Sequence, residues 1–316
     1  RPIVSALLRN RTGPLLVALQ VAVSLAILVN AIYIVVIRLE VAARPSGIAA
    51  EENVFMLHIS NQKMGEHFDQ IALQKRNAAT MRAVPGVVSV ARTNSSPMSR
   101  SGSTTSLSTD PKQTTRSAGT GYYYSPDSLI NTWGLKLVEG RDFRADEFLE
   151  IDQNTMEKFP KTAIISHELG RKLFPGESKF LGKTYFYGVG DNNDEIRIVG
   201  VIERLQTSGA SARIAGEYST LMPAHLSNDP YSGYSIRTQA GQRDRVMKDV
   251  EAALRKDAPT PINVRMRSVE EHRSNRYRND KGLAWTLLAV SALLVLVTAS
   301  GIVGMSSLWV AQRRKT

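Results

Sequence analysis

LLVALQVAVSLAILVNAIYIVVI, residues 15–37, is a stretch of 23 residues without a charged side chain. At about 1.5 Å per residue, a helix of this length reaches ~34 Å and can cross a bilayer core of ~30 Å. A second uncharged stretch, residues 283–311, lies near the other end of the chain. The sequence therefore predicts two transmembrane helices that hold the rest of the chain between them.

Charged residues are distributed unevenly around these two stretches. Six of the 40 Lys and Arg residues, and none of the 29 Asp and Glu residues, lie in the outer ends, 1–37 and 282–316. Because basic residues in short flanks stay on the cytoplasmic side, both ends are predicted inside and residues 40–280 outside. A cleaved signal peptide is the alternative for the first stretch, but its apolar core is usually only about 7–15 residues long.

Composition narrows the class of protein further. The net charge of +11 first suggests a nucleic-acid partner, but more than half of it comes from the two flanks, so we expect none. The chain has no cysteine, which excludes disulfides and thiolate metal sites. A large outer domain without disulfides fits a bacterial envelope protein, with residues 40–280 in the periplasm.

Small residues recur at four-residue spacing in both apolar stretches, which favours close helix packing in lipid. We expect the first set to meet another subunit and the second to pack within one subunit, although alanine is also simply common in helices. Gln20 and Ser24 form a neighbouring polar pair, and polar residues in a span usually face protein. The spaced positions are Ala18, Ala22, Ala26 and Asn30 in the first stretch, and Ser300 and Gly304 in the second.

The region between the stretches alternates strands and helices. Residues 54–60 are typical of a strand, 64–83 of a helix, and 87–92 of a second strand. The same order ends the region, with a helix at 243–256 and an alternating strand at 262–267. These two β-α-β units bracket the middle of the chain, which indicates one split α+β subdomain with another inserted into it. The first helix is expected to turn Phe68, Ile71, Ala72 and Ala79 to one side.

Two segments join these parts. Ser and Thr make up fourteen of the 27 residues of 95–121, which favours a mobile loop, with a polar edge hairpin as the alternative. Residues 268–281 are charged and suit a helix that leads into the second span.

Three sequences approach known functional motifs without completing them. Residues 176–184, GESKFLGKT, have five residues between the glycines where a phosphate-binding P-loop needs four. His167 and Glu168 begin like a zinc-protease helix, but position 171 is Arg. Residues 191–194 lack the spacing of a calcium loop. We therefore expect no catalytic residue, no metal site and no cofactor bound by this chain.

Several ordered segments carry a resemblance to a known family. Residues 133–143, WGLKLVEGRDF, resemble the G-L-x-L-x-x-G-R-x-F segment of MacB-type permeases of ABC transporters, which belong to the FtsX-like (type VII) superfamily. Residues 163–176, 181–183, 198–202 and 221–223 are similar to the segments that follow it. Together they cover nearly all of residues 40–280 in the family's order.

The resemblance implies an α+β periplasmic domain on transmembrane helices, with a split Porter-like subdomain and an inserted Sabre-like subdomain. The expected boundaries are a cytoplasmic segment 1–14, a span 15–37, a stalk 38–53, Porter-like parts 54–106 and 207–267, a Sabre-like part 107–206, a stalk 268–282, a span 283–311 and a coupling segment from 312.

The resemblance also implies a function. It is mechanotransmission in the bacterial inner membrane, in which a separate ATPase subunit binds ATP and Mg and the permease moves its periplasmic domain for efflux. The implied partners are that ATPase, a second permease copy or paralogue, a periplasmic membrane-fusion protein and an outer-membrane channel.

Arg313, Arg314 and Lys315 resemble the start of the family's coupling segment, after which two further spans are expected. Two alternatives stay open from the sequence. The chain suits a two-span sensor, such as a histidine kinase or chemoreceptor. It also suits a lipoprotein-releasing permease of the same superfamily, whereas a cell-division permease has a smaller outer domain.

Overall fold

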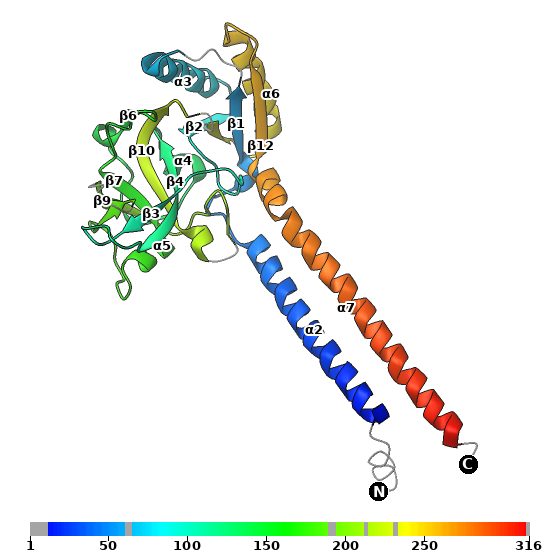
Figure 1. Ribbon diagram of the computed structural model, residues 1–316. Coiled ribbons are helices and arrows are strands. Elements are labelled where there is room, and N and C mark those ends of the chain that lie inside the picture. The colour runs from blue at the N-terminus through cyan, green and yellow to red at the C-terminus, as the bar shows by residue number, and fades with distance from the viewer. Residues whose placement is uncertain (1–11, 61–64, 189–193, 212–213, 230–232, 314–316) are drawn as a thin grey trace. The chain divides into compact units, whose positions relative to one another are not determined.

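The computed structural model describes residues 12–60, 65–188, 194–211, 214–229 and 233–313 (Figure 1). The chain divides into two compact units. One unit comprises the two ends, residues 1–44 and 277–316, and the other comprises residues 45–276.

Two long helices account for the first unit. α2 runs from Thr12 to Ala43, and α7 runs from Val269, which lies in the second unit, to Arg313. Both are long and apolar enough to cross a membrane, over Val17–Ala43 and Val269–Gly304, and few residues of their apolar windows are buried within the chain. The two expected spans are thus continuous helices, and the expected stalks are helical as far as Ala43 and from Val269.

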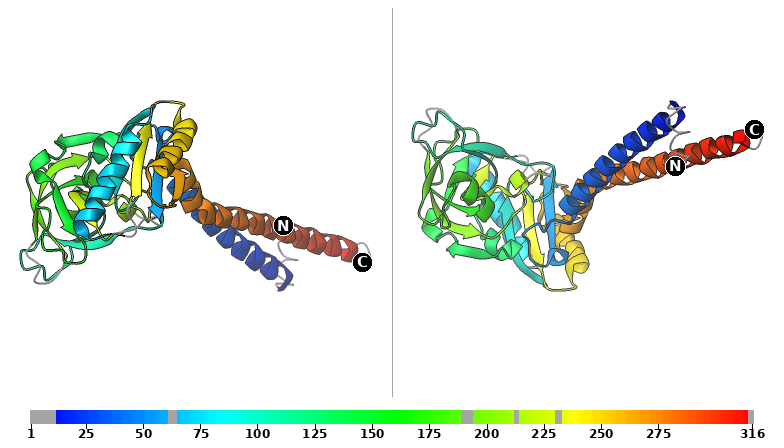
Figure 2. Two further views of the ribbon diagram at one scale, coloured as in Figure 1. Left: turned by 90° about the horizontal axis from the view of Figure 1, so that it is seen from above. Right: turned by 90° about the horizontal axis from the view of Figure 1, so that it is seen from below.

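The smaller sheet of the second unit has a ferredoxin-like order. Its strands follow the order β12-β1-β11-β2, all antiparallel to their neighbours, and α3 and α6 pack side by side on one face of it (Figure 2). This is the split β-α-β pair that the sequence indicated. The elements are β1 Val54–Ser60, α3 His67–Arg82, β2 Val87–Thr93, β11 Gly233–Thr238, α6 Arg243–Asp257 and β12 Asn263–Ser268.

The core of the smaller sheet follows from the alternating direction of side chains along its strands. Side chains of successive strand residues point to opposite faces, so every second residue of β1 meets the helices. The core cluster includes Phe55, Leu57, Met81, Ile236, Val246 and Val250. The α6 residues Val246, Val250 and Leu254 are buried as their helical spacing predicted.

The larger sheet is inserted between β2 and β11. Its strands follow the order β4-β3-β8-β9-β7-β10-β6, and an additional β4–β10 pairing closes six of them into a barrel, with β5 added beside β9. The barrel core includes Leu107, Ile165, Tyr185, Ile198, Val201 and Met222. The strands are β3 Thr104–Ser108, β4 Ala118–Ser125, β5 Leu137–Gly140, β6 Leu149–Asp152, β7 Thr162–Ser166, β8 Thr184–Tyr187, β9 Glu195–Ile202 and β10 Ser219–Ser227.

Short helices complete this half. α5, His167–Leu173, follows β7, and α4, Leu129–Trp133, is capped by the Ser128 hydroxyl. The fully buried Trp133 indole donates to the Ser235 hydroxyl of β11 at 2.6 Å, which ties α4 to the smaller sheet. Three short 3-10 helices are η1 Glu51–Asn53, η2 Ala145–Glu147 and η3 Ile214–Glu217.

Three expectations from the sequence are wrong. The Ser- and Thr-rich segment is no mobile loop, because β3 and β4 pair as an antiparallel hairpin within it, from Thr104↔Gly121 to Leu107↔Ala118. β10, expected in the second Porter-like part, pairs in the larger sheet, so the chain changes sheets between Ser227 and Gly233. On α3, Phe68 is 77% exposed, whereas Gln74 is buried.

Part of the buried face of α3 is polar, and there it meets polar side chains from both sheets. Arg92 of β2 is buried, and its guanidinium lies 5.6 Å from the ring centre of Tyr234. His225 of β10 is buried, and among the described residues its Nε2 has no hydrogen-bond partner; both side-chain amide atoms of Gln74 likewise have none. Burial, reinforced by the charge of Arg92, lowers the pKa of His225 to about 4. We call Gln74, Arg92, His225 and Tyr234 the polar seam.

The polar seam predicts a loss of stability in mild acid. His225 is neutral when folded and has a pKa near 6.5 when unfolded, so below pH 6.5 the unfolded chain binds more protons. Between pH 6.5 and 5 this should lower the free energy of unfolding of residues 45–276 by about 2 kcal/mol. Urea unfolding across this range, compared with His225→Gln, measures the contribution, and equal slopes for the two proteins would contradict it.

Candidate functional site: the helix pair and the junction residues

Polar contacts join α2 to α7 within the first unit. The Ser24 and Thr298 hydroxyls lie 2.8 Å apart, and Arg38 forms an ion pair with Asp280. A Cβ added to Gly301 would lie 3.1 Å from the amide of Gln20, so the glycine allows that side chain to approach. Ser24 and Gln20 therefore face protein, as expected for polar residues in a span.

The spaced small residues of α2 lie on a different face. Ala18, Ala22, Ala26 and Asn30 are all exposed, although Ala31 and Val35 are buried. Positions two residues apart on a helix differ by about 200°, so Ala22 and Ala26 point away from the face of Ser24. This face is a shallow apolar groove lined by Ala22, Leu25, Ala26, Val29, Asn30 and Tyr33. Its contact with another subunit stays a prediction.

The paired small residues of α7 are placed differently from our expectation. Ser300 and Gly304 are exposed, the Ser300 hydroxyl donates to the Leu296 carbonyl, and no atom lies within 4 Å of a Cβ added to Gly304. Thr298 and Gly301 meet α2 instead. Packing of Ser300 and Gly304 inside one subunit is therefore not observed in the described residues. α7 ends at Arg313, and Arg314 and Lys315 lie outside the described residues.

Within the second unit, the segments next to α2 and α7 are bound to each other and to the connection between β9 and β10. We call residues 45–51 and 268–276 the junction residues. Glu51 pairs with Arg273, whose Nε donates at 3.1 Å. Arg276 donates to the carbonyls of Gly209 and Ala210 at 2.6 and 2.9 Å. On the other segment, the backbone N–H of Gln206 donates to the Ser46 carbonyl at 2.8 Å.

Gly47 allows one of these close approaches. Its φ is +95°, and a Cβ there would lie 2.2 Å from the Arg204 carbonyl oxygen. Only glycine adopts this backbone conformation without strain and leaves room for that carbonyl. The sequence marked Pro45, Ser46 and Gly47 only as the end of a stalk, so their contact with the inserted sheet was missed.

The incomplete motifs are structural. Lys183 pairs with Glu177 at 2.7 Å, and Gly182 leads into β8 rather than into a helix, so residues 176–184 form a turn. Arg171 pairs with Glu168 on α5. Residues 191–193 of the third motif lie outside the described part of the chain. Among the described residues, no group of His, Asp and Glu is arranged to hold a metal ion.

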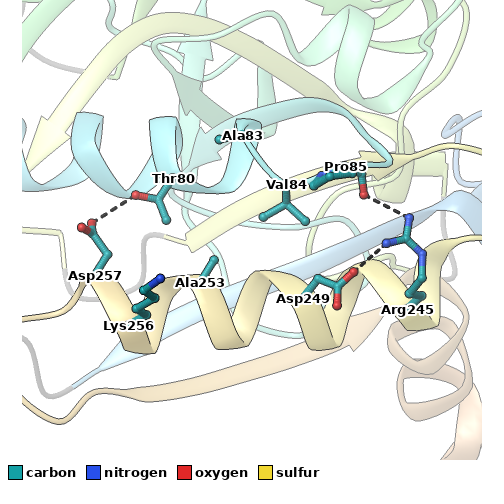
Figure 3. Close-up of a pocket in the computed structure, with 9 residues that line it drawn as sticks. All are labelled: Thr80, Ala83, Val84, Pro85, Arg245, Asp249, Ala253, Lys256 and Asp257. Atoms are coloured by element: carbon teal, nitrogen blue, oxygen red, sulfur yellow. Dashed lines mark hydrogen bonds and ion pairs between the residues drawn. The ribbon is translucent and has the colours of Figure 1, made fainter.

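A groove lies between α3 and α6, and its polar groups largely satisfy one another (Figure 3). Arg245 bridges Asp249 at 2.6 Å and the Pro85 carbonyl at 3.1 Å. Thr80 donates to Asp257 at 3.1 Å. No histidine lines the groove, and its Thr80 hydroxyl is bound to Asp257.

The comparisons with known proteins place this architecture. The family model described as the MacB-like periplasmic core domain matches residues 20–256. The chain belongs to this family. It is therefore a MacB-like permease of the ABC transporter class, as the ordered segments indicated. Membership of this family implies an ATPase partner. The family assignment favours the permease over the two-span sensor.

Solved structures include similar domains. The extracellular domain of the noncanonic ABC-type transporter YknZ from Gram-positive bacteria is 16% identical with a TM-score of 0.40, over 67% of this chain and 100% of that one. A domain of a putative permease from Porphyromonas gingivalis is 17% identical with a TM-score of 0.44, over 71% and 94%. A comparison with curated protein sequences gave no match.

The Ser24–Thr298 contact predicts a crosslink within one MacB-like chain. Because the sequence has no native cysteine, a Ser24→Cys, Thr298→Cys variant should form one disulfide under mild oxidation. The crosslinked chain should run as a monomer with altered mobility on a non-reducing gel. Ser24→Cys with Gly304→Cys is the matched control and should remain reduced; crosslinking of the control alone would place the wrong face of α7 against α2.

Proposed function

We propose that this MacB-like permease works by mechanotransmission. A separate ATPase subunit binds ATP and Mg and hydrolyses ATP in the cytoplasm, and the permease passes the resulting helix movement to its periplasmic domain to drive efflux. The observation that carries the proposal is the set of junction residues. Movement of either helix acts on segments that continue into β1 and β12 and are hydrogen-bonded to the β9–β10 connection of the larger sheet.

Several features support the parts of this proposal. The family implies an ABC ATPase partner, and hydrolysis would take place on that partner rather than on this subunit. The exposed groove at Ala22 and Ala26 offers a surface for a second permease copy or paralogue. A periplasmic membrane-fusion protein and an outer-membrane channel would extend the path for cargo.

We further propose that the chain lies in the bacterial inner membrane, with the start of α2 and the end of α7 in the cytoplasm. The basic flanks carry this orientation. Reporter fusions after Lys112, in the β3–β4 turn, and after Thr316 should report the periplasm and the cytoplasm, respectively. A reporter that is active only in the periplasm should therefore work at Lys112 alone. Activity of this reporter at both positions, or at Thr316 alone, would contradict the orientation.

The dimer and its movement can be tested together with cysteine variants. Ala22→Cys or Ala26→Cys, assembled with the ATPase partner in proteoliposomes, should crosslink between permease subunits to an extent that changes at least severalfold between ATP-trapped and nucleotide-free states. Val21→Cys is the matched control, because it lies about 100° or more from both positions around α2. Crosslinks that are absent in every nucleotide state, or equal at Val21, would contradict a moving contact at this groove.

A further inference from the structure

A second cavity in the periplasmic domain collects positive charge. It has a volume of about 470 Å³ and lies on the face of the smaller sheet opposite α3 and α6. Two arginines and two histidines line it, and no carboxylate does. The lining residues used below are His58, Ser96, Ser101, Arg265, Arg267 and His272.

Strand register places the two arginines side by side. β12 pairs with β1 so that Arg265 is opposite His58 and Arg267 is opposite Met56. Residues two apart on a strand point to the same face, and here that face is opposite the apolar core residues Val264 and Met266. Both guanidinium groups therefore project on the cavity side of the sheet.

These two arginines carry uncompensated charge. Most arginines of this domain have a carboxylate or carbonyl partner, as Arg273 has Glu51. Among the described residues, neither Arg265 nor Arg267 forms a side-chain hydrogen bond or ion pair. The two nearest acidic residues in the sequence have other partners: Glu270 pairs with Arg243 at 2.7 Å, and Glu271 accepts the backbone N–H of Ser268 at 2.9 Å. Two adjacent cations repel each other, so an anion between them would lower the electrostatic energy.

The opposite wall of the cavity is a preformed loop rich in hydroxyl groups. The loop after β2 is fixed because Met98 N–H donates to the Thr207 carbonyl at 3.2 Å and Arg100 N–H donates to the Ser208 carbonyl at 2.9 Å. Ser99 donates to the Ser101 carbonyl at 2.6 Å. Within the described part of the chain, the hydroxyls of Ser96 and Ser101 make no hydrogen bond, so they are available as donors to a ligand.

We propose that this cavity binds a phosphate group. Two guanidinium groups supply charge-assisted, forked hydrogen bonds, and the serine hydroxyls supply further donors, which together suit the several oxygens of a phosphate better than the two of a carboxylate. The phosphate belongs either to a free phosphate or small phosphate ester, or to a phospholipid headgroup. This inference is independent of the mechanotransmission proposal.

A bound phosphate would also have a structural consequence. Arg267 and His272 stand on either side of Ser268, where β12 passes into α7, and the serine loop belongs to the connection between the two sheets. The ligand would therefore link these two parts and stabilise the folded domain, since any ligand that binds only the folded state raises its stability.

The test uses the whole chain in nanodiscs of phosphatidylcholine, titrated with inorganic phosphate by isothermal calorimetry at low ionic strength. We expect saturable binding to one site. Arg265→Gln with Arg267→Gln should weaken binding at least about tenfold, because it removes both charge-assisted donors. Ser96→Trp should weaken binding similarly by filling the cavity without changing its charge.

The matched control is Arg76→Gln with Arg171→Gln, which removes the same charge from arginines that pair with Asp257 and Glu168 elsewhere on the surface. This variant should bind phosphate like the wild type. An absence of saturable binding at tens of millimolar phosphate would overturn the site. The site would also be overturned if both double arginine variants weakened binding equally, or if Ser96→Trp bound phosphate like the wild type. Arg265 and Arg267 would then serve only to keep an edge strand soluble.

A second arm identifies the source of the phosphate. In nanodiscs that contain phosphatidylglycerol, a headgroup in the cavity should compete with inorganic phosphate and weaken its apparent affinity severalfold. Unchanged affinity assigns the site to free phosphate or a small ester. Either result supports a phosphate site, whereas failure of the arginine and Ser96→Trp variants to alter binding rejects it without bearing on transport.

Discussion

The backbone pairing between β1 and β12 is the interaction on which the rest of the structure depends. β1 follows α2 in the chain and β12 precedes α7, so the segments that enter and leave the periplasmic domain become hydrogen-bonded neighbours. The pairs run from Phe55↔Ser268 to Ser60↔Asn263. All other strands of the domain, including those of the barrel, lie in the chain between these two paired strands. The ion pair of Glu51 with Arg273 strengthens the same connection just outside the sheet.

The two halves of the domain are stabilised in different ways. The barrel closes on itself through the β4–β10 pairing and has an apolar core, so it has no need of the smaller sheet to bury its strands. The halves meet at Trp133, which is bound to Ser235, and at the polar seam, where Gln74 and His225 keep atoms without protein partners among the described residues. A polar contact gains less from burial than an apolar one. Burial at the seam therefore stabilises the pairing of the halves less than burial stabilises either core.

The sequence was most informative where one physical pattern acted alone. The absence of charge over residues 15–37 suffices to predict α2, because lipid excludes charged side chains. The spacing of Val246 and Val250 likewise predicts α6, because its partner is an apolar sheet face. Prediction from the sequence failed where tertiary contacts reversed the local pattern. On α3, Phe68 is exposed and Gln74 is buried against the polar seam.

Other features could not be deduced from local patterns at all. Threonine and serine in β3 and β4 suited either a loop or a strand, and only pairing with the rest of the barrel decides between them. In the spans, the spacing of small residues pointed to Ser300 and Gly304 as the packing positions. In the structure, the contact between the helices is made instead by the hydroxyls of Ser24 and Thr298. The charge of Arg265 and Arg267 was visible in an alternating strand, but the serine loop that faces them lies far away in the sequence.

The two connections to the helices differ in a way that bears on mechanotransmission. α7 is one unbroken helix from Val269, and Ser268 and Glu271 cap its start by exchanging hydrogen bonds at 2.9 and 3.1 Å. α2 instead ends at Ala43 and is followed by a turn in which Gly47 lies against the Arg204 carbonyl, in the connection between β9 and β10. In the proposed mechanism, α7 would therefore act directly on β12, which precedes it in the chain, whereas α2 would act through a turn that is packed against the inserted half of the domain.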